Sequence, residues 1–320
     1  MKTIRSPIFV DYVHLLLLGA MWGSTFIAIE IAITNLSTLQ VSLFRIMLAF
    51  IFLLPIVFYK KYKIPNDKKT WFYICITAVL NNAIPFSLIS WSQQHISSGT
   101  AAIILACGPF TTLIIGHLFT RDEKITMIKF LGIIFGFLGV FIIFFQDVII
   151  RNDLSLLAKY AVFLASCCYV ISGFMIRKLS KISAVVCSSC MFFASSCMLA
   201  PLVLSQPLPN LYNLGNSLYA IIFLAIIPTA SASLLRINLI QKVGMHFISQ
   251  VSYLIPIFAL IWGFLFFQEL PETSTWFAFS LIILGLSMSK IKRIKNLKKI
   301  KIKIIIFSRD TFKAFRNTNI

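Results

Sequence analysis

Two adjacent asparagines, Asn81 and Asn82, lie in the middle of a long apolar segment, shortly before Pro85. Each amide offers two donors and an acceptor, which suits a zwitterionic or amide-bearing solute. Pro85 leaves one backbone carbonyl without its helical partner and so adds an acceptor. Polar groups deep in a membrane are costly and usually face a bundle interior or a water-filled cavity. We predict that these asparagines bind a solute; the alternative is that they only hydrogen-bond neighbouring helices.

Three charged residues also fall within apolar segments. Glu30 and Arg45 flank the short polar turn at 34–39, so antiparallel neighbouring helices would place them at similar depth. We hypothesise that they form an ion pair that closes an outer gate, or that protonation of Glu30 breaks the pair. A static pair or an interfacial charge is the alternative. The guanidinium fork of Arg236 suits a carboxylate or phosphate on a substrate, or the side chain extends to the membrane interface.

Prolines near the midpoints of apolar segments mark where helices are expected to break. Pro109, Pro228 and Pro256 join Pro85 in this group. Breaks at matching depth in both halves of a transporter point towards the binding site. Kinks that only tune helix packing are the alternative.

Polar residues near Pro256 extend the predicted binding site. Ser249, Tyr253 and Pro256 are spaced i, i+4 and i+7, so they share one face of a helix. We predict that Ser249, Gln250 and Tyr253 contact the substrate. The alternative for the hydroxyl groups is a bond to their own helix backbone, which is the commoner case.

No metal or cofactor is expected, and neither is an enzyme. The seven cysteines all lie in apolar runs and are odd in number, which favours small buried hydrophobic residues over a disulfide framework. Cys187 and Cys190 form a C-x-x-C without a second pair or a nearby histidine. His117 and Asp122 match an H-x-x-x-x-D pattern of membrane-associated acyltransferases, but the chain has no room for the soluble domain that carries it there.

The composition indicates which elements must position these residues. Of the 320 residues, 59% are apolar and 12% are charged, and the mean hydropathy is +0.91. Soluble domains average about 45–50% apolar and about 25% charged residues. The polar surface is therefore too small to cover a water-soluble globule. These values predict a polytopic membrane protein and disfavour a soluble enzyme, a disordered chain and a secreted disulfide scaffold.

Ten segments approach the length of about 20 mostly apolar residues that a spanning helix needs. They are 13–33, 40–59, 71–91, 98–119, 127–145, 156–176, 183–204, 217–240, 246–267 and 273–289. The first segment is too long for the apolar core of a typical signal peptide, so it is expected to span the membrane.

The basic residues alternate between the loops. Five occur in 60–69, three in 120–129 and three in 177–182. No Lys or Arg occurs in 34–39, 92–97, 205–216 or 268–272. Because Lys and Arg favour cytoplasmic loops, both termini are predicted to be cytoplasmic, in a multi-pass membrane protein compatible with a bacterial inner membrane.

The chain also repeats itself. Gln94 and Pro109 recur 147 residues later as Gln241 and Pro256, and Gly139 recurs 146 residues later as Gly285. Each copy holds five predicted helices, and an odd number of crossings inverts the second copy, as in many secondary transporters. We therefore predict an all-α fold of ten transmembrane helices in two inverted five-helix repeats. The expected parts are an N-terminus 1–12, repeats 13–145 and 156–289, an extracytoplasmic connection 146–155 and a tail 290–320.

These residues give the sequence a family resemblance. Trp22-Gly23-Ser24-Thr25-Phe26, Phe44-Arg45, the run from Asn81 to Pro109, and Tyr253-Leu254-Ile255-Pro256 followed by Glu269 resemble motifs of the EamA family of the drug/metabolite transporter superfamily. The resemblance covers about 13–289. It implies a ten-helix carrier that usually exports amino acids, related metabolites or drugs, and it adds Trp22 to the candidate substrate-binding residues.

The predicted function is secondary-active export of a small metabolite, such as an amino acid or a drug-like compound, by alternating access. Uptake or exchange of a metabolite or nucleotide-like solute is the alternative within transport. A lipid-modifying enzyme or a membrane scaffold is the alternative from another class.

The expected partners are the small-molecule substrate and membrane lipids. The tail 290–320 has 11 basic residues and one acid and is expected to attract anionic lipid. Nucleic acid is not expected as a partner, and the protein is predicted to be a monomer or a homodimer.

Overall fold

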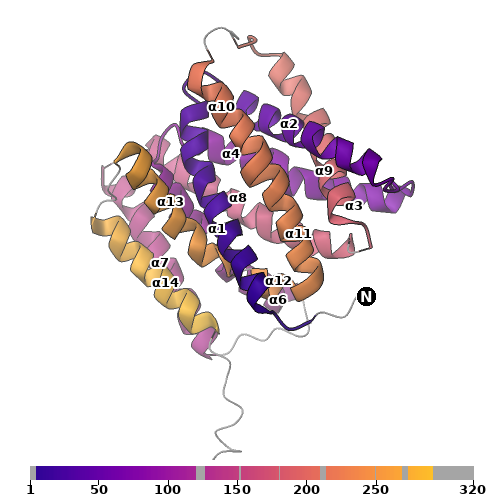
Figure 1. Cartoon of the computed structure of the whole chain (residues 1–320). Coiled ribbons are helices and arrows are strands. Elements are labelled where there is room, and N and C mark those ends of the chain that lie inside the picture. The colour runs from indigo at the N-terminus through magenta and orange to yellow at the C-terminus, as the bar shows by residue number, and fades with distance from the viewer. Residues whose placement is uncertain are drawn as a thin grey trace, which may run out of the picture.

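The protein is a bundle of helices in all the residues that its computed structural model describes, which are 5–119, 127–150, 153–179, 181–209, 214–248, 250–268 and 273–290 (Figure 1). The elements of the first half are α1 (Phe9–Ala32), α2 (Thr38–Tyr59), α3 (Lys68–Ala78), η1 (Val79–Ala83), α4 (Ile84–Ser92), α5 (Ser98–Leu105), α6 (Gly108–Phe119) and α7 (Met127–Ile150). Those of the second half are α8 (Asp153–Lys178), α9 (Ala184–Leu204), α10 (Gly215–Leu224), η3 (Ala225–Ser231), α11 (Ala232–Val243), α12 (Met245–Ile248), α13 (Val251–Phe267) and α14 (Thr273–Lys290).

Six helical stretches in the described residues are long and apolar enough to cross a membrane. They are Phe9–Ala32, Thr38–Tyr59, Lys68–Ser92, Asp153–Lys178, Ala184–Leu204 and Gly215–Val243. Four shorter apolar stretches accompany them: Ser98–Ile114, Phe130–Phe145, Val251–Phe267 and Thr273–Gly285. The chain is therefore an all-helical, multi-pass membrane protein.

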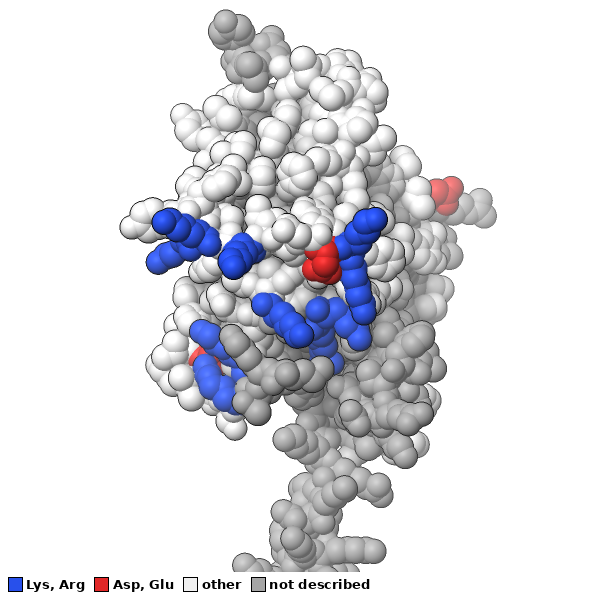
Figure 2. All heavy atoms as spheres, turned by 90° about the vertical axis from the view of Figure 1, so that its right-hand side faces the viewer, with Lys and Arg blue, Asp and Glu red and all other residues white. Residues whose placement is uncertain are grey.

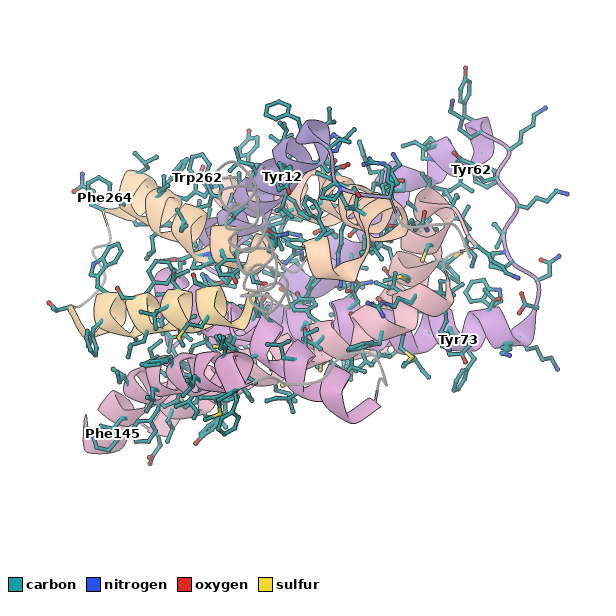
Figure 3. All side chains as sticks on the ribbon, turned by 90° about the horizontal axis from the view of Figure 1, so that it is seen from below. Tyr12, Tyr62, Tyr73, Phe145, Trp262 and Phe264 are labelled. Atoms are coloured by element: carbon teal, nitrogen blue, oxygen red, sulfur yellow. The ribbon has the colours of Figure 1, made fainter. Side chains whose placement is uncertain are left out.

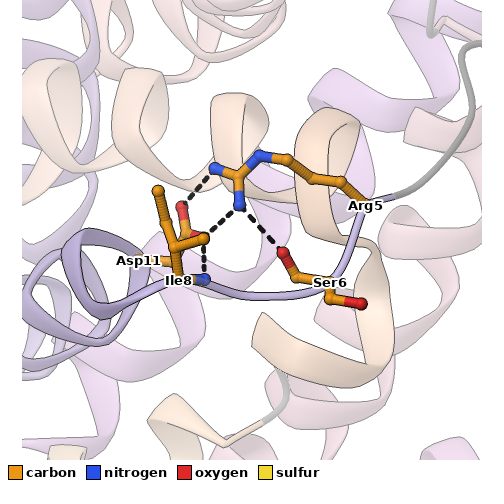
Figure 4. A network of polar contacts seen from close by, with 4 residues as sticks. All are labelled: Arg5, Ser6, Ile8 and Asp11. Carbon is orange, nitrogen blue, oxygen red and sulfur yellow. Dashed lines mark hydrogen bonds and ion pairs between the residues drawn. The ribbon is translucent and has the colours of Figure 1, made fainter.

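Local capping explains why α1 begins at Phe9, four residues before the predicted segment. The Asp11 carboxylate accepts the Ile8 backbone N–H at 2.8 Å and pairs with Arg5 at 2.6 Å (Figure 4). The Arg5 backbone N–H donates to the Lys242 carbonyl at the end of α11, at 3.1 Å. These contacts satisfy a free donor at the helix start and attach the N-terminal segment to the second half.

The two halves meet at a shorter connection than the sequence suggested. We expected residues 146–155 to link two repeats outside the membrane, but α7 continues to Ile150 and α8 begins at Asp153. Most of the expected connection is therefore helical. The predicted helix end was at Phe145, and the backbone continues in the same helix for five more residues, to Ile150.

Three of the four midpoint prolines interrupt regular helix. Pro85 follows the π-helical segment η1, and Pro228 lies inside the π-helical segment η3. Pro109 follows a break between α5 and α6, where the Leu105 carbonyl accepts the Ser166 hydroxyl at 3.3 Å. A proline has no N–H and clashes with the carbonyl four residues earlier, so each site needs a local change in hydrogen bonding.

Pro256 differs from this expectation. It lies inside α13, which is continuous from Val251 to Phe267, and the interruption falls one turn earlier, between Ile248 and Val251. The carbonyl that Pro256 leaves without a partner belongs to Ser252 in the first turn of the helix. Losing a bond there disrupts the helix less than losing one at its middle.

Glycines allow two helices of different halves to touch backbone to backbone. α7 lies beside α14 (Figure 1). A Cβ at Gly285 would lie 2.4 Å from the Gly132 carbonyl oxygen, and a Cβ at Gly139 would lie 2.6 Å from the Ala278 carbonyl oxygen. Small residues in this arrangement are what close packing of membrane helices requires.

The charged and aromatic residues define the two ends of the bundle. The exposed Lys and Arg side chains of the described residues gather on one face (Figure 2), and they are Arg5, Lys60, Lys61, Lys63, Lys68, Lys69, Arg177, Lys178, Lys181 and Lys242. Tyr62 and Tyr73 lie at one end of the molecule, and Phe145 and Phe264 lie at the opposite end (Figure 3). Tyrosines such as Tyr62 and Tyr73 at the end of an apolar bundle are typical of a membrane interface.

On the basic face, α3 begins with a side-chain cap. The Asp67 carboxylate accepts the Thr70 backbone N–H at 2.8 Å, and this bond holds the pKa of the carboxyl below its ordinary value. The cap fixes the point where the basic loop enters the bundle.

Replacing Gly285 by alanine is expected to lower the stability of the purified protein by about 1–3 kcal/mol, because the added Cβ overpacks against the backbone of α7. Thermal unfolding in detergent measures the effect as a lower melting temperature. Gly99→Ala is the matched control, since its Cβ would meet only the flexible tip of Leu260 at 2.9 Å. Equal melting temperatures for the two variants would show that the backbone contact is not needed.

Candidate functional site

A cavity of about 170 Å³ lies among helices of both halves. Its walls are mostly apolar and aromatic, with a few polar groups among them. Six residues singled out from the sequence line it: Trp22, Arg45, Asn81, Pro109, Pro228 and Arg236. A mostly apolar pocket with a few convergent polar groups is the usual form of a small-molecule site.

Arg45 reaches the cavity from α2 and is held from two directions. Its side chain is only 2% exposed. The Nε and Nη2 groups donate to the Thr229 hydroxyl of η3 at 3.1 and 2.9 Å. The Phe86 ring covers one face of the guanidinium, with its centroid 3.9 Å from Cζ. The hydrogen bonds and the cation–π contact together fix the plane of the guanidinium group.

Arg236 enters the same cavity from α11. Its Nη1 donates to the Asn81 side-chain carbonyl of η1. The Trp22 ring of α1 lies 6.0 Å from its Cζ. Arg236 is partly exposed because it faces the open space of the cavity. It therefore does not extend to the membrane interface, which was the alternative drawn from the sequence.

The two asparagines have different positions. The Asn81 carbonyl also accepts the Ser172 hydroxyl at 3.0 Å, and its amide donates to the Asn82 carbonyl at 2.9 Å. Asn82 is completely buried and does not line the cavity. Its amide donates to the Ser195 hydroxyl of α9 at 3.2 Å. Asn81 thus faces the cavity, and Asn82 connects it to the helix behind.

Glu30 and Arg45 do not form the expected ion pair. The Ser98 hydroxyl donates to the Glu30 carboxylate, and Ser98 also accepts the Gln93 amide at 3.0 Å. The described residues contain one ion pair, between Arg5 and Asp11. The sequence argument placed Glu30 and Arg45 at a similar depth in the membrane. It did not determine the direction in which each side chain points around its helix axis. Arg45 points towards Thr229 in the second half of the chain instead.

The face of α13 that lines the cavity is also shifted from the predicted one. Val251, Ser252 and Ile255 of α13 line it, together with Ile248 at the end of α12, whereas Gln250, Tyr253 and Pro256 are not among the described lining residues. Ser249 lies outside the described residues. The sequence argument selected the more polar face, but the helix presents a largely apolar face with a single hydroxyl group.

Two residues important for the site were missed from the sequence. Tyr169 of α8 lines the cavity together with Arg45 and Arg236. Ser172 bonds Asn81. Ser166, Tyr169 and Ser172 are spaced three residues apart in an apolar segment. This spacing places them along one side of a helix and was a signal that could have found them.

Comparison with known proteins supports a transporter. The model of the EamA-like transporter family matches residues 12–145 and again residues 156–290. The chain belongs to the EamA-like transporter family. It is therefore a membrane transporter, and the family's two matches in one chain fit an internal repeat.

Several relatives carry the name of transporter without a named substrate. An uncharacterized transporter of Buchnera aphidicola subsp. Schlechtendalia chinensis is 26% identical over 82% of this chain and 86% of its own length. The uncharacterized transporter YoaV of Bacillus subtilis is 20% identical over 84% of this chain and 92% of its own length. Protein PagO of Salmonella typhimurium, whose name states no function, is 26% identical over 77% of this chain and 81% of its own length.

A solved structure shares the fold. This crystal structure, which covers 89% of the present chain and 99% of its own, superposes with a TM-score of 0.65 at 12% sequence identity. The overall arrangement of the helices is therefore a known fold.

Asn82→Ala is expected to destabilise the protein by about 1–3 kcal/mol, because it leaves buried partners at Asn81 and Ser195 without their hydrogen bonds. A double-mutant cycle with Ser195→Ala, followed by thermal unfolding, measures the coupling between the two residues. Asn216→Ala is the control, since Asn216 is exposed in the first turn of α10. Strictly additive effects of the two buried changes would mean that the bond between η1 and α9 contributes nothing.

Proposed function

We propose that the protein is a secondary-active transporter that exports a small metabolite by alternating access through this cavity. The observation that carries the proposal is that hydrogen bonds across the cavity join the two halves of the chain. Arg45 of α2 bonds Thr229 of η3, and Arg236 of α11 bonds Asn81 of η1. A substrate that competes for these groups would change how the halves are held together.

The interrupted helices support two inverted five-helix repeats, 13–145 and 156–289. The π-helical segments η1 and η3 lie at corresponding places, because Asn82 and Thr229 are 147 residues apart, the same offset as Gln94 and Gln241. Each segment also packs against a helix of the other half: η1 against α9, and η3 against α2. This reciprocal packing is what a twofold relation between ten spanning helices would produce.

Interruptions at these positions also suit a transport cycle. Irregular backbone at membrane depth is tolerated where it is buried in protein or lines a cavity. It provides backbone groups for a substrate and points about which helix halves can tilt. Glu30, bonded to Ser98 of α5, and Arg45, bonded across the cavity, are the proposed gating or coupling residues.

The basic face in Figure 2 supports an orientation with both termini in the cytoplasm. Positively charged loops remain on the cytoplasmic side of a membrane. We place the protein in a bacterial inner membrane, as a monomer or homodimer, with anionic lipid bound at its tail. The tail beyond Lys290 lies outside the described residues.

The transport proposal is tested by comparing metabolites inside and outside cells that express the intact protein or Asn81→Ala. The amide of Asn81 holds Arg236 at the cavity, so its loss should abolish most of the concentration difference of the exported solute. Asn216→Ala, expressed at the same level, should export as the intact protein does. Depletion of the solute from the medium would reverse the proposed direction. Equal profiles for all three across a broad panel would favour a lipid-modifying or scaffold role.

The orientation is tested by cysteine labelling after the native cysteines are replaced by alanine. Lys63→Cys on the basic face should resist a membrane-impermeant maleimide in intact cells and react after lysis. Ser205→Cys at the end of α9 should react in intact cells. Both positions are exposed in the structure. The opposite labelling pattern would place the basic face outside.

A further inference from the structure

Among the described residues, the cavity is lined by two positive charges and no negative one. Arg45 and Arg236 both line it, and the described lining residues include no Asp or Glu. The described residues place no carboxylate within ion-pair distance of either guanidinium, since their single ion pair joins Arg5 and Asp11 at the N-terminal segment. The groups that bond the arginines, Thr229 and Asn81, are uncharged.

Both arginines keep hydrogen-bond donors available for a ligand. A guanidinium group has five N–H donors. Among the described residues, Arg45 uses its Nε and Nη2 groups on Thr229, and Arg236 uses Nη1 on Asn81. The Phe86 ring lies on one face of the Arg45 guanidinium, and the Trp22 ring lies near Arg236, with its centroid 6.0 Å from Cζ. A ring contact on the face of a guanidinium does not use its N–H groups, which point outward in the plane and can donate hydrogen bonds. Two such N–H groups bind a carboxylate or phosphate with two parallel hydrogen bonds.

An uncompensated charge inside a membrane protein is costly, and a pair of like charges in one cavity is more so. Such an arrangement is retained where a ligand supplies the opposite charge. We propose that the cavity binds a small organic anion that carries two negative charges, on carboxylate or phosphate groups, placed against Arg45 and Arg236. The proposal deepens the transport function proposed above and rests on it for the role of this anion as cargo.

The same geometry disfavours the amino acid that the sequence suggested. A zwitterion needs a negative partner for its ammonium group, and the described lining residues include no carboxylate but uncharged hydroxyl and amide groups, such as Thr25, Thr112 and Asn81. A cationic drug would meet two like charges. The hydroxyl and amide groups suit the uncharged hydroxyl or carbonyl groups of an organic anion instead.

Arg236 supplies the second positive charge of the cavity. Arg45 belongs to the Phe44-Arg45 pair through which the family resemblance was recognised, whereas Arg236 lies outside each of those motifs. Tyr169 lines the same cavity as both arginines. Because the proposed ligand carries two negative charges, Arg236 is the residue that we expect to bind the second of them.

Binding is tested by thermal unfolding of the purified full-length protein in detergent with a panel of small probes. Succinate and glycerol 3-phosphate should each raise the melting temperature by several degrees at millimolar concentration. Their uncharged counterparts succinamide and glycerol, the zwitterion glutamine and the cation putrescine should not. Inorganic phosphate tests whether the cavity needs an organic anion or binds any small anion. The proposal is overturned if the uncharged or zwitterionic probes stabilise the protein equally, or if inorganic phosphate alone does.

Variants assign the effect to the two arginines. Arg236→Gln and Arg45→Gln should each weaken anion binding by about tenfold or more, since each removes a charge-assisted pair. Arg177→Gln, at an exposed position of α8, removes one positive charge outside the cavity and should bind normally. Arg236→Gln should change the melting temperature without ligand only slightly, because the loss of the hydrogen bond to Asn81 is offset by removal of a charge that lacks a counter-charge among the described residues. If Arg45→Gln does not fold, the Arg236 variant and its control decide alone; unchanged affinity in that variant refutes the proposal.

Proteoliposomes distinguish failure of this proposal from failure of the proposed function. Labelled succinate or glycerol 3-phosphate that binds but does not cross the membrane would leave the anion site standing and refute transport of that anion. The converse result would be that no anion binds and that a neutral solute crosses the membrane equally fast with the intact protein and with Arg236→Gln. That result would support transport and refute the anion site.

Discussion

The hydrogen bond that a proline cannot make is the constraint on which this membrane fold depends. Water is absent from the bilayer core, so every backbone group released by a proline must find another partner within the protein. Around Pro85 and Pro228 the chain responds with the π-helical segments η1 and η3. At Pro109 it responds with a break and a bond from Ser166. These local repairs create the irregular middle of the bundle, and the cavity lies there.

The repaired segments also carry the polar side chains that cross the cavity. η1 presents Asn81 to Arg236, and η3 presents Thr229 to Arg45. Each arginine therefore depends on a partner from the other half of the chain. Because Asn82 and Ser195 hold η1 from behind, the position of the cavity-facing amide is set by a buried bond as well as by the helix itself. Stability and ligand binding share one polar network.

The sequence predicted the helical segments and the membrane environment well because both follow from the length and composition of apolar runs. It also singled out Asn81 and Arg236, which line the cavity, because polar residues among apolar ones usually face the interior, whereas Trp22 came from the family resemblance and Arg45 had been expected at an outer gate. It could not predict directions around a helix axis. The Glu30–Arg45 pair was wrong for that reason, and the same limit shifted the lining face of α13 to Ser252. Tyr169 was missed because a tyrosine in an apolar run is ordinary until its neighbours are known.

The close contact of α7 with α14 has a mechanical consequence. Where Gly132 and Gly285 let two backbones touch, the helices are too close for one to shift past the other without a backbone clash. The contacts around the cavity are hydrogen bonds of arginine, amide and hydroxyl groups, which can exchange partners. In the proposed transport cycle, we therefore expect the contact of α7 with α14 to stay fixed while the contacts of the cavity change.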